Sequence, residues 1–434
     1  MSHKRVLLIN PPIYDIRFEW ARWHQPCGLL QIGAFLRKQG KDVRLIDCLQ
    51  SEAKRIPKKK IGTITIEDDG LPRWHFGWSW DQIEATIQNL KDEKWRPDAV
   101  YVTCLMTFWW QAAHELVRLI HQWFPKTPVF LGGVYPSLCP AHARENFDNV
   151  HLQSHAGKSA QNFATDLRLY ERTPRFAGLF LHRSRDAERI VSEIRHKAQI
   201  GVKEFAFFDN ILPGQSTAHF EKVLDLIRKQ ELNIRLLALG NLSAGSLTKA
   251  LVVKMREAGY RQVFLRDDAS VAQSPDHYLS VYQRATDLLH KHGGFRPRSG
   301  EVTAMVVIGA PGENLEKVTE RLTQVAHIVG SVNLVQFQPT PGTTSYEQHR
   351  EYLDQMPLEM QNCKLFPFAT LNGATFADYK DLIRLGVLLN SKYRSTTFDF
   401  MGNDGIAEMI RTSIAGESWK PKLKRSLPVL PTKN

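Results

Sequence analysis

The chain has 434 residues, of which 43% are hydrophobic, so it can bury the cores of two or three ordinary domains. It contains no run of about 18 apolar residues and its first residues pass straight into a short apolar stretch, so we expect neither a membrane span nor a signal peptide. The net charge of +12 is dispersed and predicts no nucleic-acid partner, while five scattered cysteines favour a reducing cytoplasm over a disulfide framework.

Strands and helices alternate through residues 1–165. The expected strands are Arg5–Asn10, Val43–Cys48, Asp98–Cys104, Val129–Gly133 and His151–Gln153, and the expected helices are Gly28–Gln39 and Gln111–Trp123. Crossovers of this length pair strands in parallel, which predicts an α/β, flavodoxin-like doubly wound sheet. Ligands of such sheets bind beyond the carboxyl ends of the strands.

An insertion, residues 50–95, separates the second strand from the third. It contains a lysine run and an aromatic stretch with Trp74, Phe76, Trp78 and Trp80 at alternate positions. A loop this long in a compact domain is usually functional or part of an interface. The aromatic rings could stack on a flat ligand or pack against the second domain, and we favour packing.

The alternation restarts near residue 176. The expected strands are Ala177–His182, Glu204–Asp209, Ile234–Leu239, Gln262–Arg266, Val302–Ile308 and Val332–Gln338, and the expected helices are Asp186–Ile200, Ser216–Gln230, Ser246–Gly259, Asp276–His292 and Asn314–Gly330. Residues 170–350 therefore predict a partial, six-stranded (β/α) barrel. Residues 351–434 predict a mostly helical extension with helices at Phe376–Lys392 and near Gly405–Ile414, followed by a basic tail.

Several segments, taken in order, are similar to one known family. They read V-L-L-I-N-P-P-I-Y-D at 6–15, P-V-F-L-G-G-V-Y-P-S at 128–137, G-V-K-E-F-A-F-F-D-N at 201–210, I-G-A-P-G-E at 308–313 and P-T-P-G-T at 339–343. Each is moderately specific, but their order and spacing over residues 4–350 resemble the cobalamin (B12)-binding-domain radical S-adenosylmethionine (SAM) family. The resemblance implies a cobalamin-binding domain followed by a SAM-binding barrel.

The chain departs from this family where the family's chemistry begins. Active members open the barrel with three cysteines in C-x-x-x-C-x-x-C spacing, which hold a 4Fe–4S cluster that chelates SAM. The matching stretch, residues 169–184, reads L-Y-E-R-T-P-R-F-A-G-L-F-L-H-R-S and has no cysteine. The chain therefore resembles a degenerate member, for which we expect no cluster and no reductive cleavage of SAM.

Cobalamin is a candidate ligand of the first domain. Members that supply a histidine to cobalt use a D-x-H-x-x-G loop after the first strand, whereas this chain reads P-P-I-Y-D-I at 11–16. Other members bind cobalamin without a protein ligand, so the resemblance still allows the cofactor. Small and polar residues at or near expected strand ends could cradle it, although tight helix–sheet packing needs small residues equally: Asn10, Thr103, Thr107, Gly132, Gly133 and Ser137.

SAM is the corresponding candidate for the barrel. By resemblance, one pair of polar residues would contact the methionine amine, an acidic pair the ribose, and a glycine pair the adenine. An acidic pair is equally common at a solvated strand end or a helix N-cap, and paired glycines at a tight turn. These candidates are Asp209 and Asn210, Asp267 and Asp268, and Gly309 and Gly312.

The cysteines raise one further alternative. Cys27, Cys48, Cys104 and Cys139 lie near the expected carboxyl edge of the first sheet, where four thiols could bind zinc or a relocated cluster. Strands spaced by about 4.8 Å spread these thiols beyond the reach of one ion, and buried cysteine commonly behaves as a small hydrophobe. We therefore predict no metal site.

Two classes of function remain. In the first, the chain is a cluster-less pseudoenzyme or accessory subunit that binds a partner enzyme, such as an intact radical SAM homologue. It would itself bind cobalamin or SAM, and would present cobalamin or a substrate to that partner. In the second, it is an enzyme that performs cobalamin- or SAM-dependent methyl transfer by non-reductive chemistry. We favour the first because no general base or nucleophile with a supporting partner is evident.

Overall fold

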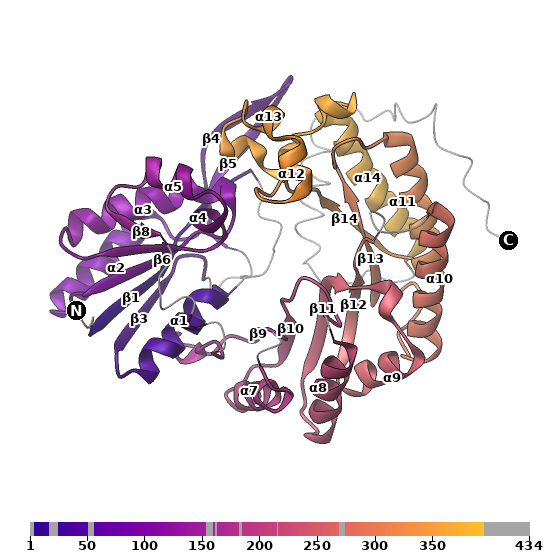
Figure 1. Ribbon diagram of the computed structural model, residues 1–434, viewed down its shortest axis with the longest axis horizontal. Helices are drawn as coiled ribbons and strands as arrows, with labels where there is room; N and C mark the ends of the chain where they lie inside the picture. Colours follow the sequence, from indigo (N-terminus) through magenta and orange to yellow (C-terminus); the bar gives the residue numbers. More distant parts are fainter. Residues whose placement is uncertain are drawn as a thin grey trace.

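The computed structural model describes residues 4–16, 25–50, 56–152, 159–160, 163–181, 185–214, 216–268 and 274–394. These residues form two parallel sheets flanked by helices, with a small antiparallel sheet between them (Figure 1). The predicted α/β class is confirmed. None of the described helices is long and apolar enough to cross a membrane. The helix expected near Gly405–Ile414 and the basic tail lie outside the described residues.

The N-terminal sheet has the strand order β3-β1-β6-β7-β8, with every pair parallel. Side chains alternate between its faces, because Val6 and Leu8 pack on one side and Leu7 and Ile9 on the other. The chain changes direction between β1 and β6, which creates a switch point between their carboxyl ends. The strands are β1 (Arg5–Asn10), β3 (Asp42–Asp47), β6 (Ala99–Thr103), β7 (Val129–Gly132) and β8 (Val150–Leu152).

Helices cover both faces of this sheet (Figure 1). Helix α1 (Cys27–Lys38) contributes Leu29 and Leu36 to one face. Helices α2 (Trp80–Asp92) and α3 (Trp110–Trp123) contribute to the opposite face. The short helices α4 (Val134–Leu138) and α5 (Pro140–Asn146) follow β7 and lead to β8.

The insertion forms a β-hairpin followed by α2. Strands β4 (Lys58–Ile66) and β5 (Asp69–Phe76) are antiparallel, and β2 (Ile13–Asp15) pairs with β5. The alternating T-I-T-I residues at 63–66 favour a strand, and Glu67-Asp68 forms the two-residue turn. The aromatic rings of this stretch pack against the N-terminal core, so their packing partner is this domain and not the barrel.

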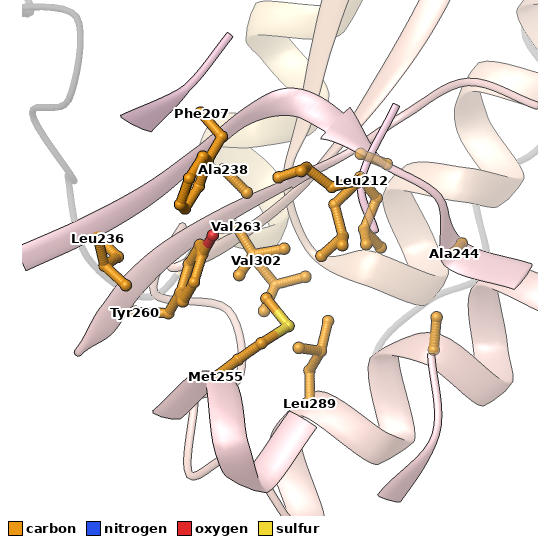
Figure 2. Close-up of a cluster of buried hydrophobic side chains, with 14 of the residues drawn as sticks. Phe207, Leu212, Leu236, Ala238, Ala244, Met255, Tyr260, Val263, Leu289 and Val302 are labelled. Atoms are coloured by element: carbon orange, nitrogen blue, oxygen red, sulfur yellow. The ribbon is translucent and has the colours of Figure 1, made fainter. Parts of the chain in front are cut away.

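The second sheet has six parallel strands in the order β14-β13-β12-β11-β10-β9, as expected of a partial barrel. Its strands are β9 (Phe176–Leu179), β10 (Glu204–Phe207), β11 (Arg235–Leu242), β12 (Tyr260–Leu265), β13 (Val302–Ile308) and β14 (Val332–Gln336). Its helices are α7 (Ala187–Gln199), α8 (Thr217–Lys229), α9 (Lys249–Glu257), α10 (Pro275–Lys291) and α11 (Leu315–Val329). Strand and helix residues share one core cluster, of which Figure 2 shows Ala238, Val263, Met255 and Leu289.

Both edges of the barrel sheet are capped by amide side chains. At β9, Gln25 donates to the Phe176 carbonyl oxygen at 2.5 Å and accepts from the Gly178 N–H at 3.3 Å. At β14, Asn390 donates to the Val332 oxygen and accepts from the Val332 N–H, both at 2.8 Å. Gln25 precedes α1 of the N-terminal domain, so the first cap also joins the two domains.

The chain after β14 runs back across both domains. It contains α12 (Thr344–Gln348), α13 (Arg350–Leu353), the 3-10 turns η5 (Leu358–Gln361), η6 (Cys363–Leu365) and η7 (Thr370–Asn372), and the helix α14 (Phe376–Tyr393). Turn η5 contacts η1 (Thr107–Trp109) of the N-terminal domain, and α14 packs on α11 and β14. The hairpin tip reaches α14, where Glu67 accepts from the Phe376 N–H at 3.0 Å.

Candidate cofactor site

The carboxyl edge of the N-terminal sheet has an open position at β7. Thr103 and Gly132 are paired in register at the ends of β6 and β7. A Cβ atom on Gly132 would have no heavy atom within 4 Å. Gly133, in contrast, has a φ of +105° and its Cβ would lie 2.3 Å from the Cys104 carbonyl oxygen, so only glycine fits there.

Two exposed apolar side chains flank this position. Leu105 follows β6 and is 52% exposed, and Val134 follows β7 and is 41% exposed. Their loops are adjacent, because Tyr135 N–H donates to the Cys104 oxygen at 3.1 Å and Cys104 N–H donates to the Gly132 oxygen at 2.8 Å. An open glycine between two exposed aliphatic side chains forms a surface that suits a flat, largely apolar ligand.

The other predicted residues at this edge have structural partners. Asn10 is buried and donates to Asp47 Oδ1 at 2.7 Å, and Tyr170 donates to the other Asp47 oxygen at 2.9 Å. Ser137 Oγ donates to the Gly133 carbonyl oxygen at 2.8 Å, within α4. Thr107 is buried at the start of η1. These residues shape the edge, whereas Thr103 and Gly132 remain partly exposed on it.

A buried ion pair joins the C-terminal extension to the switch-point side of the sheet. Lys364 Nζ lies 2.5 Å from Asp15 Oδ2, and both side chains are almost completely buried. Trp109 Nε1 donates to the same carboxylate at 2.9 Å and Asn362 Nδ2 donates to it at 3.0 Å. The Lys364 ammonium also lies 5.6 Å from the centre of the Phe108 ring.

Comparison with known proteins identifies the first domain. Residues 20–154 match the family model described as the B12 binding domain. This part of the chain is a B12-binding domain. No curated protein matches the sequence.

The whole fold is similar to that of a radical SAM enzyme. The first similar structure is the radical SAM methyltransferase TsrM from Kitasatospora setae with tryptophan substrate and the SAM analogue aza-SAM bound: 14% identity, TM-score 0.56, covering 80% of this chain and 76% of that one. The second is TsrM from the same organism with cobalamin and a 4Fe–4S cluster bound: 14% identity, TM-score 0.54, covering 81% and 75%. The B12-binding domain is therefore followed by a radical SAM-type barrel, as the sequence resemblance predicted.

The open edge of the B12-binding domain fits cobalamin. The corrin ring is broad and flat, and the open space beside Gly132, where a Cβ would meet no heavy atom within 4 Å, could receive part of it. Leu105 and Val134 would lose exposed apolar surface to it. Thr103, Gly132, Leu105 and Val134 are thus the residues that would hold the ring. The sequence pattern does not single out Leu105 and Val134, although each directly follows a predicted strand end.

The acidic residues predicted for SAM have partners within the barrel. Asp209 accepts from the Leu181 N–H at 2.6 Å. Asp267 accepts from the Val307 N–H at 2.6 Å and from the Tyr278 hydroxyl at 3.1 Å, with its side chain only 3% exposed. Asp268 accepts from Ser243 and forms an ion pair with Arg266, each at 3.0 Å. Asn210, in contrast, is exposed.

The two predicted glycines contact the C-terminal extension. The Cβ of Gly309 would lie 2.8 Å from the Phe366 ring, and its N–H donates to Glu313 Oε1 at 2.8 Å. Burial raises the pKa of Glu313. The Gly312 N–H donates to Asn372 Oδ1, also at 2.8 Å. The loop at the end of β13 is therefore fastened by the extension, and SAM binding by these residues stays a prediction.

Three partly buried phenylalanine rings lie together at the strand ends where the cluster motif would begin. Phe176 and Phe180 on β9 and after it lie 6.0 and 6.2 Å, centre to centre, from the Phe208 ring after β10. A Cβ on Gly178 would lie 2.5 Å from the same ring. The connection from β9 to α7, residues 180–186, has the sequence F-L-H-R-S-R-D, whose residues 182–184 lie outside the described residues.

None of the five cysteines is arranged as a metal ligand in the part of the chain that the structure describes. No group of three His, Cys, Asp or Glu side chains there could hold a metal ion. Burial raises the pKa of Cys27 to about 12 and that of Cys139 to about 11, which disfavours the thiolate that metals bind. The alternative of a four-thiol site gains no support, and Cys27 instead lies against Gly178 of β9.

Proposed function

We propose that this chain is a cobalamin-binding accessory protein, or pseudoenzyme, whose barrel does not cleave SAM reductively. The observation that carries the proposal is the contrast between an open Gly132 on the B12-binding domain and Phe176, Phe180 and Phe208 at the barrel position of the cluster motif. When bound, cobalamin would supply a cobalt centre able to carry a methyl group. The chain's own residues would hold and orient the corrin ring.

The cysteines support the second half of the proposal. A radical SAM cluster takes three thiolates from one short motif. Here the five thiols are Cys27, Cys48, Cys104, Cys139 and Cys363, and none is within eight residues of another. The partner we infer is an intact radical SAM homologue, which would provide the electron-transfer chemistry that this barrel lacks.

The first experiment measures cofactor binding. Protein purified without oxygen is incubated with hydroxocobalamin, passed through a gel-filtration column and examined by absorbance. We expect a corrin spectrum that co-elutes with the protein. Gly132→Ala should retain it and Gly132→Phe should lose it, because only the larger side chain projects into the space over the sheet edge. Absence of the spectrum from the wild type would overturn the cobalamin assignment.

The second experiment tests the missing cluster. After reconstitution with iron and sulfide, we expect well under one iron per chain and no 5′-deoxyadenosine from SAM and a strong reductant. About four irons per chain, together with 5′-deoxyadenosine, would contradict the proposal. Methyl transfer by the isolated, cobalamin-loaded chain would instead support the enzyme alternative.

The third experiment tests the partner. An intact radical SAM homologue is assayed alone and with the cobalamin-loaded chain, using Gly132→Phe as the control that cannot carry the cofactor. We expect the wild type to increase turnover and the variant to have no effect. Equal turnover in all three reactions would exclude a cofactor-presenting role.

A further inference from the structure

The hairpin of the insertion leaves a long strand edge open. Strand β4 pairs with β5 on one side, and no described strand pairs with its other side. Among the described residues, no backbone hydrogen bond from outside the hairpin reaches residues 59–66. The barrel sheet is different, because Gln25 and Asn390 cap both of its edges. An uncapped edge of this kind is a template for pairing with another chain.

Proline in β5 defines which backbone groups of β4 face outward. Thr63 is opposite Pro72. Facing residues of an antiparallel pair either exchange two hydrogen bonds or none, and proline has no N–H to donate. The Thr63 N–H and carbonyl therefore point away from β5, and those of Thr65, two residues along, point the same way.

The second half of this edge, residues 62–66, has little protection against pairing. Lys58–Lys60 and a bulge at Ile61 lie in its first half, and both features discourage pairing. Residues 62–66 read G-T-I-T-I, with no charge or proline and with strongly strand-forming side chains. Ile61 is 42% exposed at the boundary.

The charges identify the occupant. The strand is basic at its beginning, with Lys59 and Lys60, and ends in an acidic turn, Glu67-Asp68. Two copies in antiparallel orientation would place each basic end beside the acidic turn of the other copy. A strand that is complementary to itself in this way forms a two-fold, isologous contact.

We propose that β4 pairs with β4 of a second copy of this chain, with the two-fold axis at Ile64. Thr63 of each copy is then opposite Thr65 of the other, and these pairs exchange about four backbone hydrogen bonds. Beyond the paired segment, Lys60 of each copy lies toward the acidic turn Glu67-Asp68 of the other. The result is one continuous antiparallel sheet with the order β2-β5-β4-β4-β5-β2. The contact is small, so we expect a weak, concentration-dependent dimer.

Sedimentation velocity over a concentration series tests the proposal. The wild type should shift from monomer to dimer as concentration rises. Thr63→Pro should remain monomeric, because it removes an outward N–H that the hairpin does not use, whereas Thr63→Val keeps that N–H and should dimerise. Circular dichroism and thermal unfolding check that both variants are folded. A wild type that is monomeric throughout, or a folded Thr63→Pro variant that dimerises like it, would overturn the proposal.

A charge exchange tests the register. Lys60→Glu should weaken dimerisation, by more at low salt than at high salt, because it places two acids side by side. Adding Asp68→Lys to the same chain reverses the charges at both ends of β4 and should restore dimerisation. A double variant that folds like the wild type but does not recover dimerisation would contradict pairing about Ile64.

Discussion

The two parallel sheets of this protein have carboxyl edges of opposite character. On the B12-binding domain, Gly132 is open and Leu105 and Val134 are exposed around it. At the barrel, Asp209, Asp267 and Gly309 form hydrogen bonds with the neighbouring residues Leu181, Val307 and Glu313. A fold can thus leave the edge of one sheet open while the polar groups of the other are used for its own stability.

The largest effect is expected where the extension joins the two regions. Lys364→Met leaves Asp15 buried without its cation, and breaking a buried pair from one side costs about 3–5 kcal/mol of unfolding free energy. The matched control is Lys380→Met, which breaks a half-exposed pair with Asp69 and should cost about 1 kcal/mol or less. Urea unfolding measures both. Equal losses of unfolding free energy in the two variants would show that the buried Asp15–Lys364 pair stabilises the fold no more than the half-exposed pair does.

The next effect separates a structural from a binding role in the barrel. Asp267→Ala leaves the Val307 N–H and the Tyr278 hydroxyl without their acceptor, so we expect a loss of about 2–4 kcal/mol. Asp268→Ala, at a more exposed ion pair, should cost about 1 kcal/mol or less. Thermal unfolding with and without SAM gives the answer. If Asp267→Ala is as stable as the wild type but its melting temperature no longer rises with SAM, Asp267 has a binding role and not a structural one.

A third, smaller effect concerns the open edge. Gly132→Phe should weaken cobalamin binding at least tenfold, about 1.4 kcal/mol, with little change in the melting temperature of the cofactor-free protein. Gly133→Ala should do the opposite and lower the melting temperature, because its Cβ would meet the Cys104 oxygen. Titration by absorbance and melting curves distinguish the two. Destabilisation by both variants would mean that Gly132 is only a packing residue.

The smallest effect is a pH dependence of the stability, caused mainly by histidines of the B12-binding domain. Burial lowers the pKa of His75, His114, His121 and His142 there, and of His290 in the barrel, among the described residues. A lowered folded pKa gives stability that is present above the unfolded pKa of 6.5 and is lost as pH falls below it. The melting temperature should therefore fall between pH 7.5 and 5.5.

His75 provides the test of that dependence. Its pKa is lowered by burial and, more weakly, by Lys59, whereas a hydrogen bond to the Trp78 oxygen and the nearby Glu115 oppose the change. His75→Gln should flatten the decline of melting temperature with acid. An unchanged slope would place the acid sensitivity elsewhere.

The regular elements were predictable because their apolar patterns are local. Arg5–Asn10 and Val302–Ile308 were predicted to the residue, and the other strands of the two parallel sheets to within about three residues. The hairpin was interpreted as a loop, although the alternation at 63–66 was visible, because lysines and the acidic turn surround it. Local patterns specify strands and helices but not the partner of an isolated polar residue.

The site was predictable only in part for the same reason. Gly132 could be proposed from the sequence because glycine at the end of a strand is a local signal. Asp15 and Lys364 are 349 residues apart, and no spacing rule connects them. Asp267 was placed at its strand end from the sequence, but its bonds to Val307 and Tyr278 depend on how β13 and α10 pack beside it.

The amide of Gln25 has a consequence for the history of this gene. Gln25 lies just before α1 of the B12-binding domain, yet its side chain forms hydrogen bonds with the backbone of β9, the edge strand of the barrel. Recombination that exchanged one half for an unrelated module would leave Phe176 and Gly178 without these bonds. The two halves are therefore expected to be inherited, and to diverge, as a single unit.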